Sequence, residues 1–372
     1  MIRRPPRSTQ GVSSAASDVY KRQYYDFRSN IGVAQEEVLK IDGEVGFNPN
    51  LGPIKELFDQ GSLAVINGIG YPTPNRSHFR SRDIWYTAEP EKVGSQGWLG
   101  AAIRDLDSKG ENVLTGVNFG RGLPRALVCK GVPVASVGNL ETYGLLPDMA
   151  DEKVRLNAID AFSRLYGPTG GKDVVAQVLS ETGSNALKGA DTLRTAPQKY
   201  SSTVEYADNS IAQSLKSAAQ VMFSDIGTRV FYTQYQSFDT HSNELQSHGK
   251  LWQDVSSALS DFTDDLKAHG RFDDTMIFIF SEFGRRIRDN GTGCDHGSGG
   301  VAFAIGGQVN GGLYGAMPSL EEKDQTEGDL RFNNDFRASY ATILDRWLAV
   351  SYTHLRAHET RHDLVCRLLL EK

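Results

Sequence analysis

Three short polar clusters beside apolar, strand-like runs constrain the fold of this chain more than any other feature. Residues 238–241 (Phe-Asp-Thr-His) and 281–286 (Ser-Glu-Phe-Gly-Arg-Arg) directly follow such runs, and residues 294–297 (Cys-Asp-His-Gly) directly precede one. In an open α/β sheet, side chains at the carboxyl ends of strands converge on a crevice where ligands bind. Carboxylates and imidazoles that meet there can coordinate a divalent metal. The pattern predicts an α/β fold with a metal-binding sheet edge.

The order of the remaining segments predicts the architecture. Helices are expected at residues 51–60, 77–87, 151–166, 209–226, 242–269 and 335–349. Strands are expected at residues 63–66, 113–119, 125–137, 228–236, 275–280 and 301–305. This alternation favours a mostly parallel sheet flanked by helices on both faces. Asn310-Gly311 is expected to form a hairpin turn, and the polar residues 167–206 a mobile excursion or cap.

Both ends of the chain differ from its middle in composition and periodicity. Residues 13–23 and 350–360 back-translate codon by codon into opposite transposase-type sequencing adapters. We therefore expect residues 1–23 and 350–372 to be adapter-derived rather than native, and residues 24–349 to be an N-terminally truncated α/β domain. The two tails are expected to make no packed interface with the core, because no selection matched them to it.

Composition excludes several classes of function. The chain has 40 Lys and Arg against 46 Asp and Glu, a net charge of −6, and its middle is more acidic than its ends. No nucleic-acid partner is expected, since phosphate contacts need clustered basic residues. No transmembrane segment is expected, because no apolar run approaches the ~20 residues that cross a bilayer. Between the tails only Cys129 and Cys294 occur, which argues against a disulfide framework or a thiolate metal site.

The first cluster offers three candidate metal ligands. Asp239 and His241 are two positions apart just past a strand end, where both can point into one pocket. His248 could reach the same pocket from the following helix. The alternative is that Asp239 caps that helix and His241 lies on the surface. The local sequence leaves His248 equally open between the two interpretations.

The other two clusters add carboxylate, imidazole and guanidinium groups. Glu282 follows its strand immediately, where the sheet opens, and could serve a site, form an ion pair with Arg285 or Arg286, or do both. Either arginine could bind an anionic oxygen. Asp295 and His296 stand in a Gly-rich loop that permits close approach to a ligand. The alternative there is an Asp turn with an exposed histidine.

Ser77 begins a predicted helix after a loop that contains two prolines. A hydroxyl at a helix N-terminus faces the positive end of the helix dipole. That position suits helix capping and also an activated nucleophile for an anionic substrate. The local sequence leaves both roles open, and it favours a site role for His78 less than for Ser77.

Several segments together resemble the DUF1501 family, which is similar to the alkaline phosphatase/sulfatase superfamily. The segments are, in order, residues 77–85, 97–100, 238–243, 281–286, 295–297 and 335–337. The resemblance implies an alkaline-phosphatase-like fold and two divalent ions, which could be Zn²⁺, Mn²⁺, Mg²⁺ or Ca²⁺. Members of that family often carry a twin-arginine export signal, which implies a periplasmic or extracellular location.

The resemblance also implies roles for individual residues. Asp239 and His241 look like one metal half-site, Glu282 and His296 resemble further ligands, and Ser77 falls at the position of the nucleophile. The complete candidate set has Ser77 and Arg285 as catalytic residues, and Asp239, His241, His248, Glu282, Asp295 and His296 as metal ligands. The family begins with a strand that ends in a Gly-Gly-Asn-Asp-Gly-like turn, and nothing here matches it. We therefore expect a strand and a ligand to be missing and this chain to be nearly inactive.

The expected function is metal-dependent hydrolysis of a phosphate or sulfate ester of a small molecule or a glycan. The alternative is a non-catalytic exported binding or surface protein that retains the same scaffold, because fold alone does not imply function. The metal content of a full-length homologue separates the two. The sequence gives no indication of the oligomeric state.

Overall fold

The computed structural model describes residues 23–42, 45–143, 151–166, 174–351 and 355 of the 372-residue chain. The helices are α2 (Gly52–Asp59), α3 (His78–Thr87), α4 (Trp98–Leu106), α5 (Glu152–Tyr166), α6 (Val174–Lys199), α7 (Ser210–Phe223), α8 (Glu244–Ala268) and α9 (Phe336–Thr342). The strands are β1 (Leu39–Lys40), β2 (Gly46–Phe47), β3 (Leu63–Gly70), β4 (Gly116–Phe119), β5 (Ala135–Val137), β6 (Val230–Thr233), β7 (Ile277–Ile279), β8 (Gly300–Ile305), β9 (Gly312–Tyr314) and β10 (Asn334–Asp335). The α/β class expected from the sequence is confirmed.

Strand β3 is the centre of the larger sheet. It pairs antiparallel with β8 and parallel with β9 and β10, and β8 pairs antiparallel with β7. The smaller sheet consists of β5, β4 and β6, all parallel. The prediction of a mostly parallel arrangement is therefore correct for the smaller sheet and wrong for the larger one. The larger sheet is mixed because the chain from β7 to β8 turns back through a loop, which places β8 antiparallel to β7, rather than crossing over through a helix.

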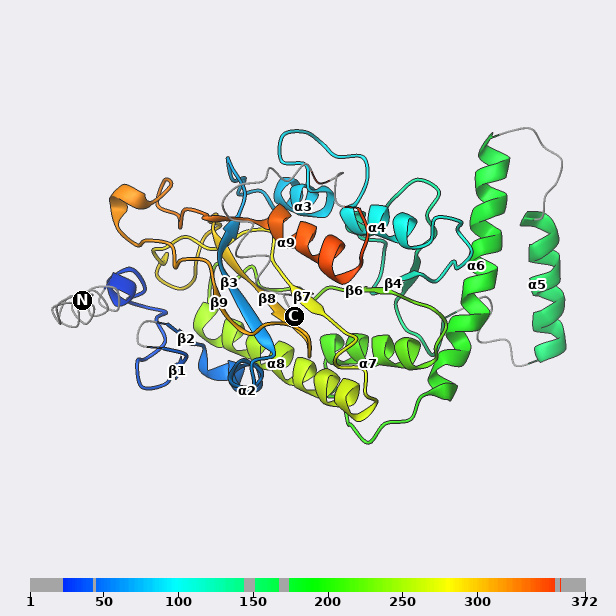
Figure 1. Cartoon of the computed structure of the whole chain (residues 1–372), viewed down its shortest axis with the longest axis horizontal. Coiled ribbons are helices and arrows are strands. Elements are labelled where there is room, and N and C mark those ends of the chain that lie inside the picture. Colours follow the sequence, from blue (N-terminus) through cyan, green and yellow to red (C-terminus); the bar gives the residue numbers. More distant parts are fainter. Residues whose placement is uncertain (1–22, 43–44, 144–150, 167–173, 352–354, 356–372) are drawn as a thin grey trace, which may run out of the picture.

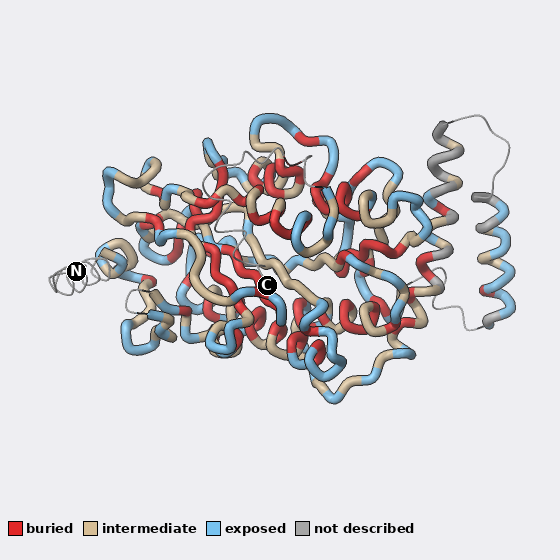
Figure 2. The backbone as a smooth tube through the Cα atoms, in the orientation of Figure 1, coloured by how far each residue is buried: buried red, intermediate tan, exposed pale blue. Residues whose placement is uncertain are grey.

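Both sheets face the same two layers of helices. In β3, Val65 joins a core with α2, α7 and α8, whereas Ile66 joins a second core with α3, α4 and α9. In β6, Phe231 packs against the first core and Tyr232 against the second. Figure 1 shows these two sets of helices on opposite sides of the strands, and Figure 2 shows buried residues along the strands between them. Among the described strands, β6 pairs only with β4, and β7 only with β8.

Three local predictions are wrong. Residues 125–137 form a short 3₁₀ helix and strand β5 instead of one strand, since the chain turns at Gly131, which has a φ of 76°. The predicted hairpin at Asn310-Gly311 is absent because β9 pairs with β3 rather than with β8. The last predicted helix is α-helical only to Thr342 and continues as a π-helical turn over Ile343–Trp347.

Helices α5 and α6 project from the rest of the molecule in Figure 1. The segment 167–206, predicted to be a mobile excursion or cap, contains a helix of 26 residues, α6. Its C-terminal part is anchored, because Leu193 and Ala196 are fully buried in the core with α7 and α8. Residues 167–173 lie outside the described part of the chain. None of the described helices combines the length and the apolar composition that crossing a bilayer requires.

The C-terminal tail makes two contacts with the core. Leu355 is 1% exposed and belongs to the core with α3, α4 and α9, and Val350 packs against the same core. The expectation that the tails have no packed interface is therefore wrong for these two residues, whose apolar side chains find space beside α9. Residues 1–22 and 356–372 lie outside the described residues.

Candidate functional site

Loops from distant parts of the sequence meet at one place in the fold. They are the start of α3, the loop after β6 and the loop between β7 and β8, which folds back on itself. The two arms of the β7–β8 loop are joined by backbone hydrogen bonds from Gly284 N to the carbonyl of Ser298 and from Gly297 N to the carbonyl of Gly284, both 2.9 Å long. A Cβ atom at Gly297 would meet the backbone of Arg285. Glycine is therefore required for the close approach of these two arms.

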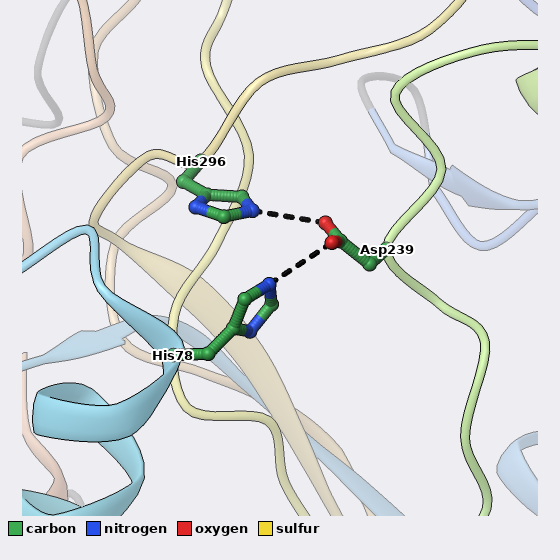
Figure 3. A group of neighbouring side chains, drawn as sticks. All are labelled: His78, Asp239 and His296. Carbon is green, nitrogen blue, oxygen red and sulfur yellow. Dashed lines mark hydrogen bonds and ion pairs between the residues drawn. The ribbon is translucent and has the colours of Figure 1, made fainter.

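Asp239 lies at the centre of the side-chain cluster that these loops form (Figure 3). Its Oδ1 atom is 2.9 Å from Nε2 of His296 and 3.0 Å from Nε2 of His241. Its Oδ2 atom is 3.0 Å from Nε2 of His78. Arg285 donates a hydrogen bond of 2.8 Å to Oδ1. Three imidazoles and one guanidinium thus surround a single carboxylate.

Each of the three imidazoles also contacts an oxygen atom through Nδ1, the ring nitrogen that faces away from Asp239. The Nδ1 partners are Glu282 Oε1 for His78 (2.9 Å), Asp295 Oδ1 for His241 (3.0 Å) and the carbonyl oxygen of Arg76 for His296 (2.7 Å). Carbonyl and ionised carboxylate oxygens only accept hydrogen bonds, so each Nδ1 is placed to donate to its partner. The three Nε2 atoms face inward to the carboxylate of Asp239, which is also an acceptor, so both nitrogens of each ring meet acceptors.

This arrangement has more acceptors than ring protons, because a neutral imidazole carries one N–H and each ring faces two acceptors. The Nε2 atoms of His241 and His296 are 2.9 Å apart. The Nε2 atom of His78 is buried and makes no hydrogen bond, although it lies 3.0 Å from Asp239. An additional ring proton or a cation between these atoms would resolve the conflict, because buried polar atoms are costly when unpaired. The potential ligand atoms of His78, Asp239 and His296 all lie within 4.8 Å of one another.

Asp239 and Asp295 are ionised at neutral pH. Burial raises the pKa of Asp239, but hydrogen bonds from Arg285, His296 and His78 outweigh burial and hold that pKa well below its usual value. The hydrogen bond from His241, followed by one from Asn290, lowers the pKa of Asp295. Both groups therefore carry the negative charge that a metal ligand, or a partner of a ligating imidazole, needs.

The predicted site residues divide into those that face the cluster and those behind it. Asp239, His241 and His296 meet directly, whereas Glu282 and Asp295 contact the outer nitrogens of imidazoles. Arg285, predicted as an anion-binding residue, is engaged by the protein. Besides Asp239, it donates to the carbonyl oxygens of Phe238 (2.7 Å) and Cys294 (3.0 Å). Its guanidinium fixes two loops in place.

His248 does not join the cluster. Trp252 donates a hydrogen bond of 2.6 Å to its Nε2, and its Nδ1 lies 3.5 Å from the hydroxyl of Thr240. Its ring also packs edge-on against Phe238. Burial lowers the pKa of His248, which favours the neutral ring. The structure does not support the prediction that His248 is a ligand, since neighbouring side chains on α8 and its preceding loop engage both nitrogens.

The sequence favours a site role for Ser77 over His78, whereas the structure places His78, and not Ser77, in contact with Asp239. Ser77 is the N-cap residue of α3, but its hydroxyl makes no capping hydrogen bond and is exposed. His78, the first residue of α3, places its ring in the cluster. Its inclusion in a family-like segment is the only signal that sequence reasoning had, because its partner Glu282 is 204 positions away.

The thiol nearest the cluster is expected to be unreactive. Cys294 is fully buried, and burial raises its pKa to about 12. In a chain with Cys129 and Cys366 replaced by serine, we expect a disulfide reagent at pH 8 to modify Cys294 at least about a thousandfold more slowly than free cysteine, since the thiolate is the reactive form. Reaction at the rate of free cysteine would contradict this, and addition of denaturant should restore that rate.

The fold and the cluster define an α/β protein with a carboxylate and three imidazoles gathered where strand-connecting loops meet. Residues 172–345 match the model of a family described as "Protein of unknown function (DUF1501)". This match supports the family resemblance seen in the sequence, and it includes Asp239, His241 and His296 but begins after His78. No curated protein and no solved structure significantly matches the chain.

Proposed function

We propose that the cluster binds a divalent metal ion through Asp239 and the Nε2 atoms of His78 and His296. The observation that carries the proposal is the common orientation of the imidazoles, each held at Nδ1 by an acceptor and directed at one carboxylate by Nε2. Ligating histidines in metal sites almost always donate their other N–H to a carboxylate or a carbonyl, which fixes the tautomer and orients the ring. The orphaned, buried Nε2 of His78 fits such a ligand.

The donor set favours some ions over others. Imidazole nitrogens suit Zn²⁺ and similar transition metals, whereas Mg²⁺ and Ca²⁺ prefer oxygen ligands. We therefore propose Zn²⁺ as the ion held by His78, Asp239 and His296. His241 lies on the Oδ1 side of Asp239, opposite the oxygen that faces His78. Asp239 and His241 would hold a second ion on that side, and this part of the proposal rests on the superfamily resemblance.

The reaction that we propose is hydrolysis of a phosphate or sulfate ester of a small molecule or a glycan. A divalent ion in this site would supply Lewis-acid polarisation of the ester oxygen. Arg82 is available for an anionic substrate, because it lies one helical turn after His78, is 43% exposed and is 3.8 Å from Glu282. Ser77 lies at the N-terminus of α3, where anions are favoured. A periplasmic or extracellular location belongs to the same proposal.

Equilibrium competition with a chromophoric chelator tests the metal site. We expect the chelator-treated chain to take up Zn²⁺, and the His78→Ala and His296→Ala variants to bind it at least about a hundredfold more weakly, since each removes one ligand. Asp264→Asn, on an exposed face of α8, is the control and should leave the affinity unchanged. Equal affinity in the parent chain and both histidine variants would contradict the proposal.

Turnover is measured separately with 4-nitrophenyl phosphate and 4-nitrophenyl sulfate, each with and without added Zn²⁺ or Mn²⁺. Hydrolysis that depends on metal and is lost in His296→Ala supports the reaction proposed here. Metal binding without turnover of either ester, also in a longer homologue, would leave the metal site standing and remove the hydrolase proposal. That outcome would favour an exported binding protein.

A further inference from the structure

Asp329 is a buried carboxylate that lies outside the cluster and pairs with Arg76, two residues before His78. Asp329 is fully buried, and its Oδ2 atom accepts two hydrogen bonds from the guanidinium of Arg76, at 3.0 Å from Nε and 2.8 Å from Nη2. Its Oδ1 atom makes no hydrogen bond and lies 3.9 Å from Nε of Arg286. A buried carboxylate is costly unless it is paired, and losing its partner is more costly still. Its pairing with Arg76 therefore fixes that residue firmly.

Arg76 connects Asp329 to two imidazoles of the cluster. Its carbonyl oxygen accepts the 2.7 Å hydrogen bond from Nδ1 of His296. Its position in the chain is two residues before His78, so it also precedes the first turn of α3. Because the side chain of Arg76 is held by Asp329, its backbone carbonyl cannot easily move away from His296.

The loop that carries Asp329 also supports the loop of His296 directly. The carbonyl of Leu330 accepts hydrogen bonds from Gly299 N at 2.9 Å and from the hydroxyl of Ser298 at 2.6 Å. Arg286, which forms an isolated β-bridge with Asp329, donates its N–H to the carbonyl of Asp295 at 3.0 Å. The segment around Asp329 therefore braces both sides of His296 along the backbone.

We propose that Asp329 is a positioning residue: through Arg76 it fixes the carbonyl that accepts the hydrogen bond from Nδ1 of His296, and thereby it orients Nε2 of His296 toward Asp239. The consequence for the orientation of the His296 ring follows from the hydrogen bonds alone. The consequence for metal affinity rests on the proposed function.

The same arginine offers a matched control. Glu327 also pairs with Arg76, at 3.4 Å, but its side chain is 79% exposed. Exposed ion pairs contribute little, because water screens them and long side chains lose entropy when they are held. Glu327→Gln removes one negative charge two positions from Asp329 and should have no effect on His296.

The Nδ1 hydrogen bond of His296 is measured by ¹⁵N NMR of the histidine rings at one fixed pH, with the His296→Gln spectrum identifying the signals of His296. We expect the parent chain and Glu327→Gln to give the same His296 resonances. In Asp329→Asn, the Nδ1 resonance should shift, because the carbonyl of Arg76 is no longer held at hydrogen-bond distance. An unchanged His296 spectrum in a folded Asp329→Asn protein overturns the proposal.

Zn²⁺ competition provides the second measurement. We expect about a tenfold loss of affinity in Asp329→Asn, at the lower end of the 10- to 100-fold effects of partners behind metal ligands. Arg76→Met should lose the same factor, and the double variant should lose no more than either single one. Additive losses, or parent-like affinity in Asp329→Asn, would show that the connection does not run through Arg76.

Failure of the proposed metal site and failure of the proposed role of Asp329 give different results. If the parent chain binds no Zn²⁺, the metal site is wrong and the NMR measurement still decides the role of Asp329. If Asp329→Asn does not fold, Arg76→Met takes its place, because the side chain of Arg76 is partly exposed. An unchanged His296 spectrum in that variant overturns the proposal.

Discussion

Replacing Asp239 by asparagine is expected to abolish measurable Zn²⁺ binding and to destabilise the chain above pH 4. The carboxylate faces three imidazoles and Arg285, and an amide supplies neither the charge nor the second acceptor oxygen. Removing it leaves the guanidinium of Arg285, which is 17% exposed, without its anionic partner. We expect a loss of metal affinity larger than the effect of removing either His78 or His296 alone.

The pH dependence of this variant follows from the pKa of Asp239. That pKa is lower in the folded chain than the value of about 3.9 in an unfolded one. The carboxylate therefore contributes stability in full above about pH 4, and this contribution is lost as the pH falls through the folded pKa. Denaturant unfolding of the metal-free chain should show a difference between parent and Asp239→Asn at pH 7 that narrows below pH 4. A difference that stays constant to pH 2 would contradict the assignment.

Replacing Gly297 by alanine is expected to have the second largest effect. The added Cβ would lie 2.5 Å from the carbonyl carbon of Arg285 and 2.7 Å from the amide nitrogen of Arg286. Backbone atoms cannot rotate away as a flexible side chain can, so the two arms of the β7–β8 loop must separate. We expect a loss of about 3 kcal/mol in the free energy of unfolding, at the upper end of overpacking effects. Metal affinity should fall as well, because His296 is the preceding residue.

Gly52→Ala is the control for that prediction. A Cβ at Gly52 meets nothing within 4 Å, and the residue is the first of α2. Alanine is favoured over glycine in helices, so this variant should be as stable as the parent or slightly more stable. Chemical denaturation measures both variants on one scale. Equal stability of Gly297→Ala and Gly52→Ala would show that the β7–β8 loop accommodates the added methyl group.

The sequence predicts the strands that carry the cluster because those strands are short, apolar and followed directly by polar residues. β6, β7 and β8 all fall within predicted runs or one residue from them. Asp239 and Glu282 come soon after β6 and β7, so the ends of the strands determine where their side chains can lie. The prediction could not supply strand direction, because neither apolar runs nor loop lengths state whether the chain between β7 and β8 turns back.

The parts of the cluster that sequence reasoning missed depend on long-range or backbone contacts. His78 is identified only once its helix lies against the loop of Glu282. The contact of His296 with the backbone carbonyl of Arg76 cannot be predicted from residue types, since every residue has a backbone carbonyl. His248 shows the opposite error: a histidine one or two turns into a nearby helix satisfies the spacing, but Trp252 and Phe238 determine its surroundings.

The position of β3 in the larger sheet has a consequence for how the chain is made. β3 is complete at Gly70, whereas β8, β9 and β10, its three partners, lie between Gly300 and Asp335. At synthesis rates of about 5–20 residues per second, the ribosome needs roughly 10–50 s to reach the first of them. During that interval the apolar eight-residue strand β3 has none of its pairing partners, so the larger sheet assembles only after β8 has been synthesised.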